Sequence, residues 1–549
     1  MKKIISLLSL LIVLTYNSNA QFNYDSTQPF YVCNASGAQY NVRLLSPYSG
    51  ANSLVFWMDE RNGPGSTEIY AQLLDASGNP LWGTNGKPIV SGINKDIFEY
   101  NVVLWQFGFL VSWAQGPAGL AADSLMCQFY NLSGNPFWTS PVVIAESASS
   151  GIVYFSNSNG AKIHLIESAS DLWVTWQAVY PGGSSGMRFN KMDQTGSLTW
   201  PVNGQPAVPN GYAPYETCSD SAGGFYMMYT TGGINADIYL QHYDPSGGGL
   251  FSNPVNMTTG FAGRGYKWSM IADGASNFYF VWDSGTGDVY ITKYNTDGTP
   301  AWNPAAKTIC SASLNQINAN AIYYNGNIYS TWADQRPPAN NYFIYIQKTD
   351  TAGNMIWTND GEISSNLPSI IPHPKVGLLS GGNILNVHRT AFDGFRAQRF
   401  QPNANTSWAM NGVPVYNGVN TSGPFDNDFQ MHNTANDNMV IAWSSSSDIY
   451  AAKLLSNGIL ADVKELNNEA LLNVYPNPVQ NTLWINNNFE NNSMNLQIFD
   501  ISGRLIIEQY VGGTQLQQSG IDVSILHSGT YSITLNNEEN QYHSLFIKQ

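Results

Sequence analysis

The sequence predicts an all-β protein in which an eight-bladed β-propeller is followed by a small immunoglobulin-like β-sandwich. Three observations lead to this prediction. A unit of 51–62 residues recurs eight times, each unit contains four short stretches with strand-like alternation, and the C-terminal residues form a separate alternating pattern. A seven-bladed ring is the alternative.

The first 20 residues are expected to be a signal peptide and not part of the fold. Lys2 and Lys3 precede an apolar run over residues 4–14, and the small-residue pattern that ends at Ala20 predicts cleavage after that residue. No later stretch reaches the ~18 apolar residues of a transmembrane helix. The mature protein is therefore expected to be exported.

Composition narrows the possible partners. Only 11% of the 549 residues are charged, and 23 Lys+Arg against 38 Asp+Glu give a net charge of −15 with no basic block. This balance argues against a nucleic acid or an anionic membrane as the partner, and we expect a monomer. The four widely spaced cysteines (Cys33, Cys127, Cys218 and Cys310) and the seven histidines show no metal-ligand spacing, so we predict buried free thiols, no metal and no cofactor.

Two sets of anchor residues define the repeats within residues 21–465. The first follows a turn, of the form Asp-x-x-Gly at Asp75, Asp193 and Asp350, and comprises Trp82, Trp138, Trp200, Phe251, Trp302, Trp357 and Trp408, with a degenerate eighth copy near Asp462. The second ends a short apolar run and comprises Trp57, Trp113, Trp176, Tyr229, Trp282, Trp332 and Trp443, with His388 in the seventh copy. Both sets share one period, as expected for blades of a propeller.

The second repeat illustrates the four strands. Residues 99–105 alternate, Phe107 and Gly108 make a tight turn, residues 109–113 are apolar, and two further strands flank a Ser-Gly-Asn turn. Residues 29–36 resemble the fourth-strand segment 308–313, whereas the eighth repeat is weak in that strand. We therefore expect residues 29–36 to complete the last blade, which leaves no unpaired edge in the ring.

The repeated charged motifs are predicted to be structural. The Asp of the Asp-x-x-Gly turn, as at Asp75 and Asp350, caps backbone amides of its own turn. Neighbouring carboxylates such as Asp59 and Glu60 point to opposite faces of a strand, so they cannot face each other as a glycosidase pair does. Local pairing of Asp59 with Arg61 is the expected role.

Candidate binding residues lie on the first strand of each repeat. One face is apolar, and the other carries an excess of cations that would form a positive funnel if it lines a central channel. The residues selected are Arg43, Lys162, His164, Lys267, Trp268, Lys375 and His432. Pairing of these cations with Glu216 or a nearby Asp is the alternative explanation. Tyrosines of the variable loops, such as Tyr180, Tyr215 and Tyr266, could stack on sugars or pack within the fold.

These features favour a binding or adhesion protein that recognises anionic glycans or proteins. No catalytic residue is assigned, because no GxSxG, HExxH or phosphate-binding loop is present. A carbohydrate-active hydrolase or lyase on the propeller is the second hypothesis, in which a lyase would use His164 or His432. A purely structural surface protein is the third.

Residues 470–549 resemble the type A C-terminal sorting domain of the type IX secretion system of Bacteroidetes. The resemblance rests on Tyr475-Pro476-Asn477-Pro478, an Asp-x-x-Gly-Arg turn at Gly503, a Gly-x-Tyr strand at Gly529 and Tyr531, and the terminal Lys548, in that order. It implies export through the periplasm and across the outer membrane by this machinery, to the cell surface or the medium. The repeats also resemble an uncharacterised repeat of secreted Bacteroidetes proteins, which implies no activity.

Overall fold

The computed structural model describes two compact units, Met1–Asp462 and Val463–Gln549. The described residues are 26, 30–460 and 470–549, with internal gaps at 48–51, 119–121, 148–162, 169, 180–184, 210–211, 231–236, 259–267, 275–276, 285–286, 337–340, 370–372, 391–393, 418–428, 435–436, 473, 486–492, 501–504, 513–518 and 537–540. Ala20, Lys162, Lys267, Gly503 and the loop tyrosines Tyr180 and Tyr266 therefore lie outside the described residues.

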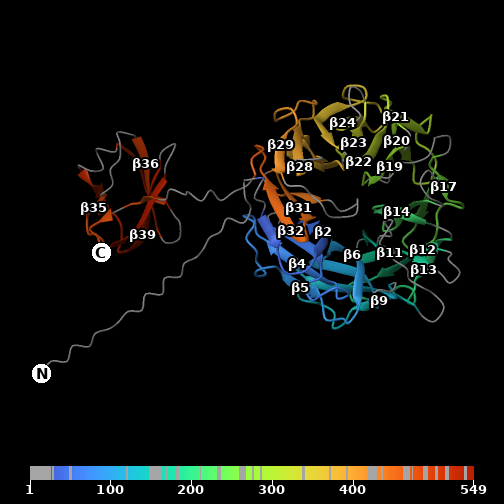
Figure 1. The fold of residues 1–549 in the computed structure, drawn as a ribbon, viewed down its shortest axis with the longest axis horizontal. Helices are drawn as coiled ribbons and strands as arrows, with labels where there is room; N and C mark the ends of the chain where they lie inside the picture. Colours follow the sequence, from blue (N-terminus) through green and yellow to red (C-terminus); the bar gives the residue numbers. More distant parts are fainter. Residues whose placement is uncertain are drawn as a thin grey trace. The chain divides into compact units, whose positions relative to one another are not determined.

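The described part of the first unit is all-β and propeller-like, with eight antiparallel four-stranded sheets arranged in a ring (Figure 1). The first four sheets in chain order each use four consecutive strands. Sheet 1 contains β2 (Gln39–Leu45), β3 (Ser53–Asp59), β4 (Glu68–Leu74) and β5 (Lys87–Val90); sheet 2, β6 (Asp96–Trp105), β7 (Gly108–Gly116), β8 (Ser124–Asn131) and β9 (Val142–Glu146); sheet 3, β10 (His164–Ser168), β11 (Asp171–Val179), β12 (Ser185–Met192) and β13 (Gln205–Pro209); sheet 4, β14 (Tyr212–Ser219), β15 (Phe225–Thr230), β16 (Ile238–Tyr243) and β17 (Val255–Asn256).

Sheets 5, 6 and 7 also use four consecutive strands, whereas sheet 8 combines the N-terminal strand with the last three strands of the unit. Sheet 5 contains β18 (Trp268–Ala272), β19 (Phe278–Asp283), β20 (Val289–Tyr294) and β21 (Ala306–Cys310); sheet 6, β22 (Gln316–Tyr324), β23 (Asn327–Asp334), β24 (Tyr342–Asp350) and β25 (Glu362–Ser369); sheet 7, β26 (Lys375–Leu378), the short 3-10 turn η1 (Ser380–Gly382), β27 (Ile384–Thr390), β28 (Gly394–Phe400) and β29 (Val413–Tyr416); sheet 8, β1 (Phe30–Cys33), β30 (Gln430–Thr434), β31 (Asn438–Ser445) and β32 (Asp448–Leu454).

The N-terminal strand supplies the outer strand of sheet 8. β1 pairs antiparallel with β32, from Phe30 opposite Ala451 to Cys33 opposite Ile449. The first strands of consecutive sheets contact one another in a closed circuit that runs from β2 through β6, β10, β14, β18, β22, β26 and β30 back to β2. The pairing of β1 thus joins the two ends of the chain segment that forms the ring.

The anchor residues pack between sheets and explain the repeat. The second-strand anchors, including Trp57, Trp176 and Trp332, are fully buried. Six of the seven first-set anchors pack on a turn glycine of the next sheet, so that a Cβ added at Gly247 would lie 2.7 Å from the Trp200 ring; Trp357 meets Ala404 instead. Gly247 also has a φ of +81°, which only glycine adopts without strain. The close approach of the Trp200 ring and the positive φ therefore both favour glycine at this position of the turn.

A second inter-sheet contact closes at all eight junctions between the described sheets. A side-chain N–H of one sheet donates to a backbone carbonyl in the turn that follows the third strand of the next sheet. We call these contacts turn clasps: Lys87 to Ser133, Trp138 to Gln194, Lys191 to Pro245, His242 to Thr296, Lys307 to Ala352, Lys348 to Pro402, Arg399 to Ser456 and Lys453 to Ala76. The last clasp links sheet 8 to sheet 1.

The second unit contains a five-stranded and a three-stranded sheet around one apolar core. The five-stranded sheet has the order β33 (Ala470–Leu471), β40 (Gln541–Lys548), β39 (Gly529–Asn536), β36 (Ser493–Asp500) and β37 (Leu505–Gly512), and the smaller sheet has the order β34 (Val474–Tyr475), β35 (Thr482–Ile485) and β38 (Ile521–Asp522). Among the described residues of the chain, no helix is long and apolar enough to cross a membrane.

The four cysteines are unpaired. Cys33, Cys127 and Cys310 are buried, and Cys218 is partly exposed. Burial raises the pKa of the Cys33 thiol to about 11 and that of the Cys310 thiol to about 12, so these thiols stay protonated and unreactive near neutral pH. The sequence expectation of free thiols agrees with this arrangement.

Candidate functional site

The innermost strand of each sheet contributes one polar side chain at the same register position. This position lies opposite the residue that precedes the second-strand anchor, as Arg43 lies opposite Phe56. We call the set the inner polar ring: Arg43, Asn101, His164, Glu216, Ser269, Asn320, Lys375 and Gln430. Ser269 is buried and the other seven are half-buried, so solvent reaches most of the ring.

Side chains of the inner polar ring reach laterally to the next sheet. Asn101 Nδ2 donates to the carbonyl of Ile163 at 2.7 Å, Ser269 Oγ accepts from the amide of Ala321 at 2.9 Å, and Asn320 Oδ1 accepts from the amide of Val376 at 3.0 Å. Lys375 Nζ donates to the carbonyl of Phe429 at 2.5 Å and lies 4.8 Å from the centre of its ring. The ring therefore has a structural role at several junctions.

Two carboxylates lie beside cationic or titratable side chains of the inner polar ring. Arg43 Nη2 lies 3.1 Å from Glu99 Oε1 of sheet 2, and the two side chains are 16% and 21% exposed. His164 Nδ1 lies 3.9 Å from Glu216 Oε2 of sheet 4, and the His164 ring packs against Tyr215. The Glu99 carboxylate thus pairs with Arg43, and Glu216 lies beside His164, which corresponds to the pairing alternative that the sequence left open; the Lys375 ammonium group is bonded to a backbone carbonyl instead.

The remaining predicted binding residues occupy different environments. His432 lies two residues beyond Gln430, and its Nε2 is 3.0 Å from Ser53 Oγ of sheet 1. Burial lowers the pKa of His432, which favours the neutral imidazole. Trp268 is half-buried, and its ring centre is 6.4 Å from that of Phe280. Tyr215 is buried and donates its hydroxyl to the carbonyl of Thr175, so the suggestion that it stacks on a sugar is wrong.

Sequence reasoning missed Glu99 as the partner of Arg43. The reason is local: β2 and β6 both contain register shifts, between Tyr40 and Arg43 and between Ile97 and Glu99. Asn41, within the first shift, has a φ of +58°. An irregularity of this kind changes which side chains share a face, and strict alternation cannot reveal it.

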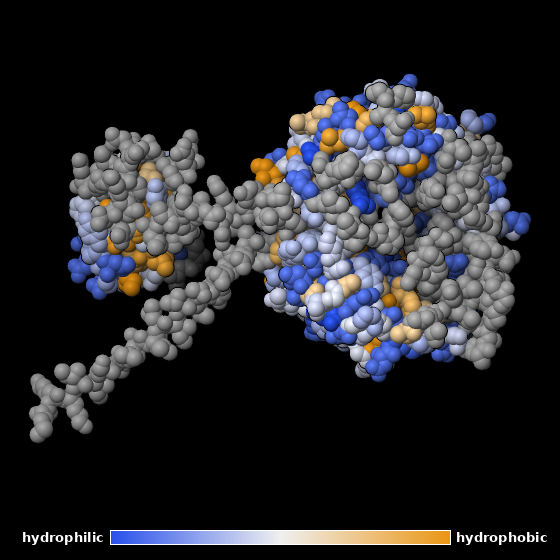
Figure 2. Space-filling model, in the orientation of Figure 1, coloured by the Kyte–Doolittle hydropathy of each residue, from blue (hydrophilic) through white to orange (hydrophobic). Residues whose placement is uncertain are grey.

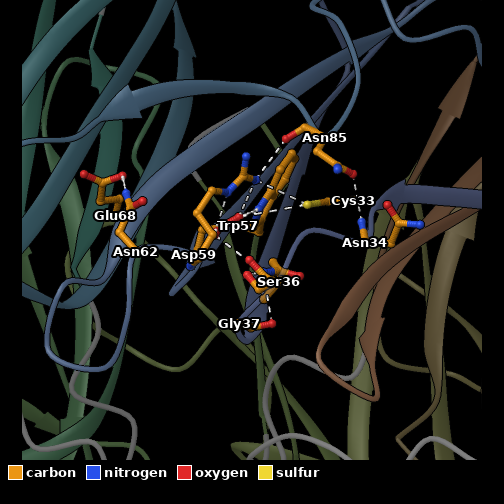
Figure 3. Close-up of polar contacts among 11 residues, drawn as sticks. Cys33, Asn34, Ser36, Gly37, Trp57, Asp59, Asn62, Glu68 and Asn85 are labelled. Atoms are coloured by element: carbon orange, nitrogen blue, oxygen red, sulfur yellow. Dashed lines mark hydrogen bonds and ion pairs between the residues drawn. The ribbon is translucent and has the colours of Figure 1, made fainter.

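The Trp-x-Asp-x-Arg motif forms a buried structural cluster (Figure 3). Asp59 accepts from Trp57 Nε1 at 2.7 Å and from Arg61 Nη2 at 2.6 Å, while Arg61 also donates to the carbonyl of Asn85 at 3.0 Å. Cys33 of β1 lies beside this cluster, with its Sγ 3.4 Å from Arg61 Nη2. The Asp59 carboxylate is buried and accepts hydrogen bonds from neighbouring side chains of the cluster, which supports a structural role.

The same cluster recurs in sheet 6. Asp334 accepts from Trp332 Nε1 at 2.9 Å and from Arg336 Nη2 at 2.6 Å, and Cys310 Sγ lies 3.4 Å from Arg336 Nη2. The recurrence at equivalent positions of two sheets supports a structural role. The Asp-x-x-Gly turns behave likewise, because Asp75 Oδ1 accepts from the amides of Ser77 and Asn79.

In the second unit, the Tyr-Pro-Asn-Pro segment is bound to the last strand of the chain. Asn477 Nδ2 donates to the carbonyl of Leu545 at 3.1 Å, and Asn477 Oδ1 accepts from the amide of Ile547 at 2.8 Å. Tyr531 donates to the carbonyl of His527, while Lys548 lies in β40 opposite Gly529. Residues 473–549 match the family model of the secretion system C-terminal sorting domain.

The second unit is a secretion sorting domain. The predicted resemblance to the type IX secretion sorting domain is thereby confirmed, and the protein is exported to the cell surface or the extracellular space. Tyr475, Pro476, Asn477, Pro478, Gly529, Tyr531 and Lys548 lie in the part of the sorting domain that the structure describes. No curated protein sequence matches the chain.

Solved structures resemble the chain with low sequence identity. A prolyl endopeptidase is 12% identical with a TM-score of 0.41, and the match covers 75% of this chain but only 54% of the endopeptidase. A PL25 ulvan lyase bound to -[GlcA(1-4)Rha3S]- is 11% identical with a TM-score of 0.38, over 66% of this chain and 93% of the lyase. The β-propeller domain of the Trilobed protease from Pyrococcus furiosus is 10% identical with a TM-score of 0.36, over 67% and 98%.

Proposed function

We propose that this protein is an exported binding or adhesion protein built on an eight-bladed β-propeller that β1 closes. The observation that supports this function best is the inner polar ring. One side chain at the same level of each innermost strand makes a continuous belt of amide, hydroxyl, carboxylate and cationic groups on rigid strands. Such convergent polar groups are suited to holding a ligand, because little side-chain freedom is lost on binding.

The proposed ligand is an acidic polysaccharide. Arg43, His164 and Lys375 would contact its carboxylates, and the amides of Asn101 and Asn320 would contact its hydroxyls. Lys162 and Lys267 lie outside the described residues; they stand two residues before His164 and Ser269 in the sequence and would add to the positive charge of these segments. Glu99 and Glu216 would restrict the site to ligands that also donate hydrogen bonds.

The test is binding of the exported chain, residues 21–549, to an array of acidic and neutral glycans at two salt concentrations. We expect binding to acidic glycans that weakens as salt increases. Arg43→Gln should weaken this binding by about three- to tenfold, the usual effect of losing one partly exposed charge contact.

The matched control is Arg399→Gln. Arg399 is an arginine of similar side-chain exposure, but it serves the turn clasp to Ser456 and not the inner polar ring. Equal binding by both variants would contradict the assignment of the ring as the ligand site. Binding only to acidic proteins, and to no glycan, would contradict the proposed ligand class.

A further inference from the structure

The strand pair that closes the ring holds two tyrosines in contact. Tyr31 of β1 lies directly opposite Tyr450 of β32, and the centres of their rings are 4.7 Å apart. Tyr31 is 48% exposed, whereas Tyr450 is only 6% exposed. One phenol of the pair is therefore accessible from solvent, and the other is covered by the fold at the joint between the two ends of the first unit.

Among the described tyrosines, this pair combines the shortest separation with solvent access. The ring centres of the other tyrosine pairs in contact are 5.8 Å apart in Tyr229–Tyr239, 6.0 Å apart in Tyr279–Tyr323 and 6.2 Å apart in Tyr416–Tyr450. All members of these three pairs are buried or half-buried. A reagent in solvent therefore reaches the pair at β1 more readily than the others.

Contacts within the joint hold the two phenols in place. The Tyr450 ring stacks on Trp443, with the ring centres 5.8 Å apart and the planes inclined by 15°. The hydroxyls of Tyr31 and Tyr450 are hydrogen-bonded to each other, and Tyr450 Oη lies 3.5 Å from Asp448 Oδ2. The phenols are thus positioned side by side, with a carboxylate near enough to accept a proton.

Adjacent phenols of this kind can couple by oxidation. Each phenol gives up one electron and one proton, and the two phenoxyl radicals then form a carbon–carbon bond between ring positions next to the hydroxyls. The two bonded ring carbons lose their hydrogens to the phenolate oxygens, which restores both aromatic rings. Hydrogen peroxide, acting through a peroxidase, takes up the two electrons and two protons and becomes two molecules of water.

We propose that Tyr31 and Tyr450 are a dityrosine modification site at which a peroxide-driven one-electron oxidant joins β1 covalently to β32. The proton of Tyr450 would leave through Asp448, and that of the half-exposed Tyr31 would pass to water. Because the protein is exported to the cell surface or the extracellular space, soluble oxidants have access to it. The modification is independent of the ligand site proposed above.

The new bond would lock the closure of the ring. It would connect residues 31 and 450 and so enclose the chain segment that supplies the other strands of the eight sheets. A cross-link over so long a segment restricts the unfolded chain strongly, by the argument used for disulfides. The cross-linked protein should therefore melt about 5 °C higher than the untreated protein.

The experiment treats residues 21–549, at high dilution, with a haem peroxidase and hydrogen peroxide. We expect dityrosine fluorescence in a product that remains a single chain on a denaturing gel. Trypsin should then release residues 21–43 joined to residues 400–453, the peptides that hold Tyr31 and Tyr450. The mass of the joined peptides should be two hydrogen atoms below the sum of the separate peptides.

Conservative variants locate the bond. Tyr31→Phe and Tyr450→Phe keep the aromatic rings but cannot form a phenoxyl radical, so each should lower the yield of the joined peptides at least about tenfold. Tyr239→Phe is the matched control, because it removes one phenol of the half-buried pair in sheet 4, and it should leave the yield unchanged. Tyr31→Phe after the same treatment is the reference for the melting temperature.

Four results would overturn the proposal. They are the absence of dityrosine, dityrosine only between separate chains, an undiminished yield of joined peptides in Tyr31→Phe, and an equal loss of yield in Tyr239→Phe. A cross-linked product that melts no higher than treated Tyr31→Phe would contradict the locking role. None of these readouts involves a glycan, so their failure is distinguishable from failure of the proposed binding function.

Discussion

Replacing Arg336 with methionine should destabilise the first unit by about 3 to 5 kcal/mol, the cost of breaking a buried ion pair from one side. Asp334 is fully buried and receives Arg336 Nε at 2.9 Å and Nη2 at 2.6 Å in addition to Trp332 Nε1 at 2.9 Å. The substitution removes the two guanidinium bonds and the contact of Arg336 with the Tyr345 ring at 3.8 Å, and it leaves the carboxylate buried.

The assay is urea unfolding at pH 7 followed by tryptophan fluorescence. The double variant Asp334→Asn with Arg336→Met should lose less stability than Arg336→Met alone, because no charge remains buried. Arg188→Met is the control, since Arg188 donates to the backbone carbonyls of Asn203 at 2.6 Å and Gly204 at 2.9 Å. A loss below about 1 kcal/mol in Arg336→Met, an average effect for any substitution, would refute this reasoning.

The loss of stability caused by Arg336→Met should depend on pH. Burial alone would raise the pKa of Asp334, but the hydrogen bonds from Arg336 and Trp332 outweigh it and hold the pKa below its ordinary value. A carboxyl with a lowered folded-state pKa stabilises the fold above about pH 4, and this contribution is lost as the pH falls through the folded-state pKa. The stability difference between the native protein and Arg336→Met should therefore shrink below about pH 4. A difference that stays constant from pH 7 to pH 3 would contradict the assigned pairing.

Three further predictions concern other parts of the chain. Deleting residues 21–36 removes β1 and exposes the edge of β32. The variant should therefore have a lower melting temperature and aggregate, which light scattering during a thermal scan would detect. His388 is buried without a hydrogen-bond partner in the structure, and burial lowers its pKa to about 3. The unfolded state binds the proton first, so stability should fall between about pH 6.5 and pH 3, and His388→Leu should reduce that slope in urea titrations. Asn477→Ala removes both side-chain bonds to β40 and should destabilise the sorting domain by about 1 to 2 kcal/mol, with less protein secreted in an export assay.

The repeated sheets were predictable because two independent sets of anchors carry the period. Aromatic anchors pack between sheets in most repeats, and six of the seven first-set anchors meet a turn glycine, so the pattern survives where the rest of the sequence varies. The pairing of residues 29–36 with the last repeat was predictable from their likeness to a fourth strand. The sorting domain was predictable because the Tyr-Pro-Asn-Pro segment and the last strand bond to each other, as Asn477 does with Ile547.

The contacts between sheets could not be predicted in the same way. The partner of Arg43 depends on two register shifts. Lys375 bonds to a backbone carbonyl, a group that every residue carries, so the sequence does not indicate which residue it contacts. Some donors of the turn clasps follow a pattern in the sequence: Lys191, Lys348 and Lys453 each lie two residues before the first residue of the turn in their own sheet. Their role becomes visible only when the next sheet is in place. On the face displayed in Figure 2, groups of hydrophobic residues lie among hydrophilic ones in the coloured part of the surface.

The most direct test of the central claim is the salt dependence of acidic-glycan binding by residues 21–549, measured for the native sequence, Arg43→Gln and Arg399→Gln. If the inner polar ring is the ligand site, the native protein and Arg399→Gln bind alike at low salt, both weaken at high salt, and Arg43→Gln binds about three- to tenfold more weakly with a smaller salt dependence. Identical binding curves for all three proteins would contradict the claim.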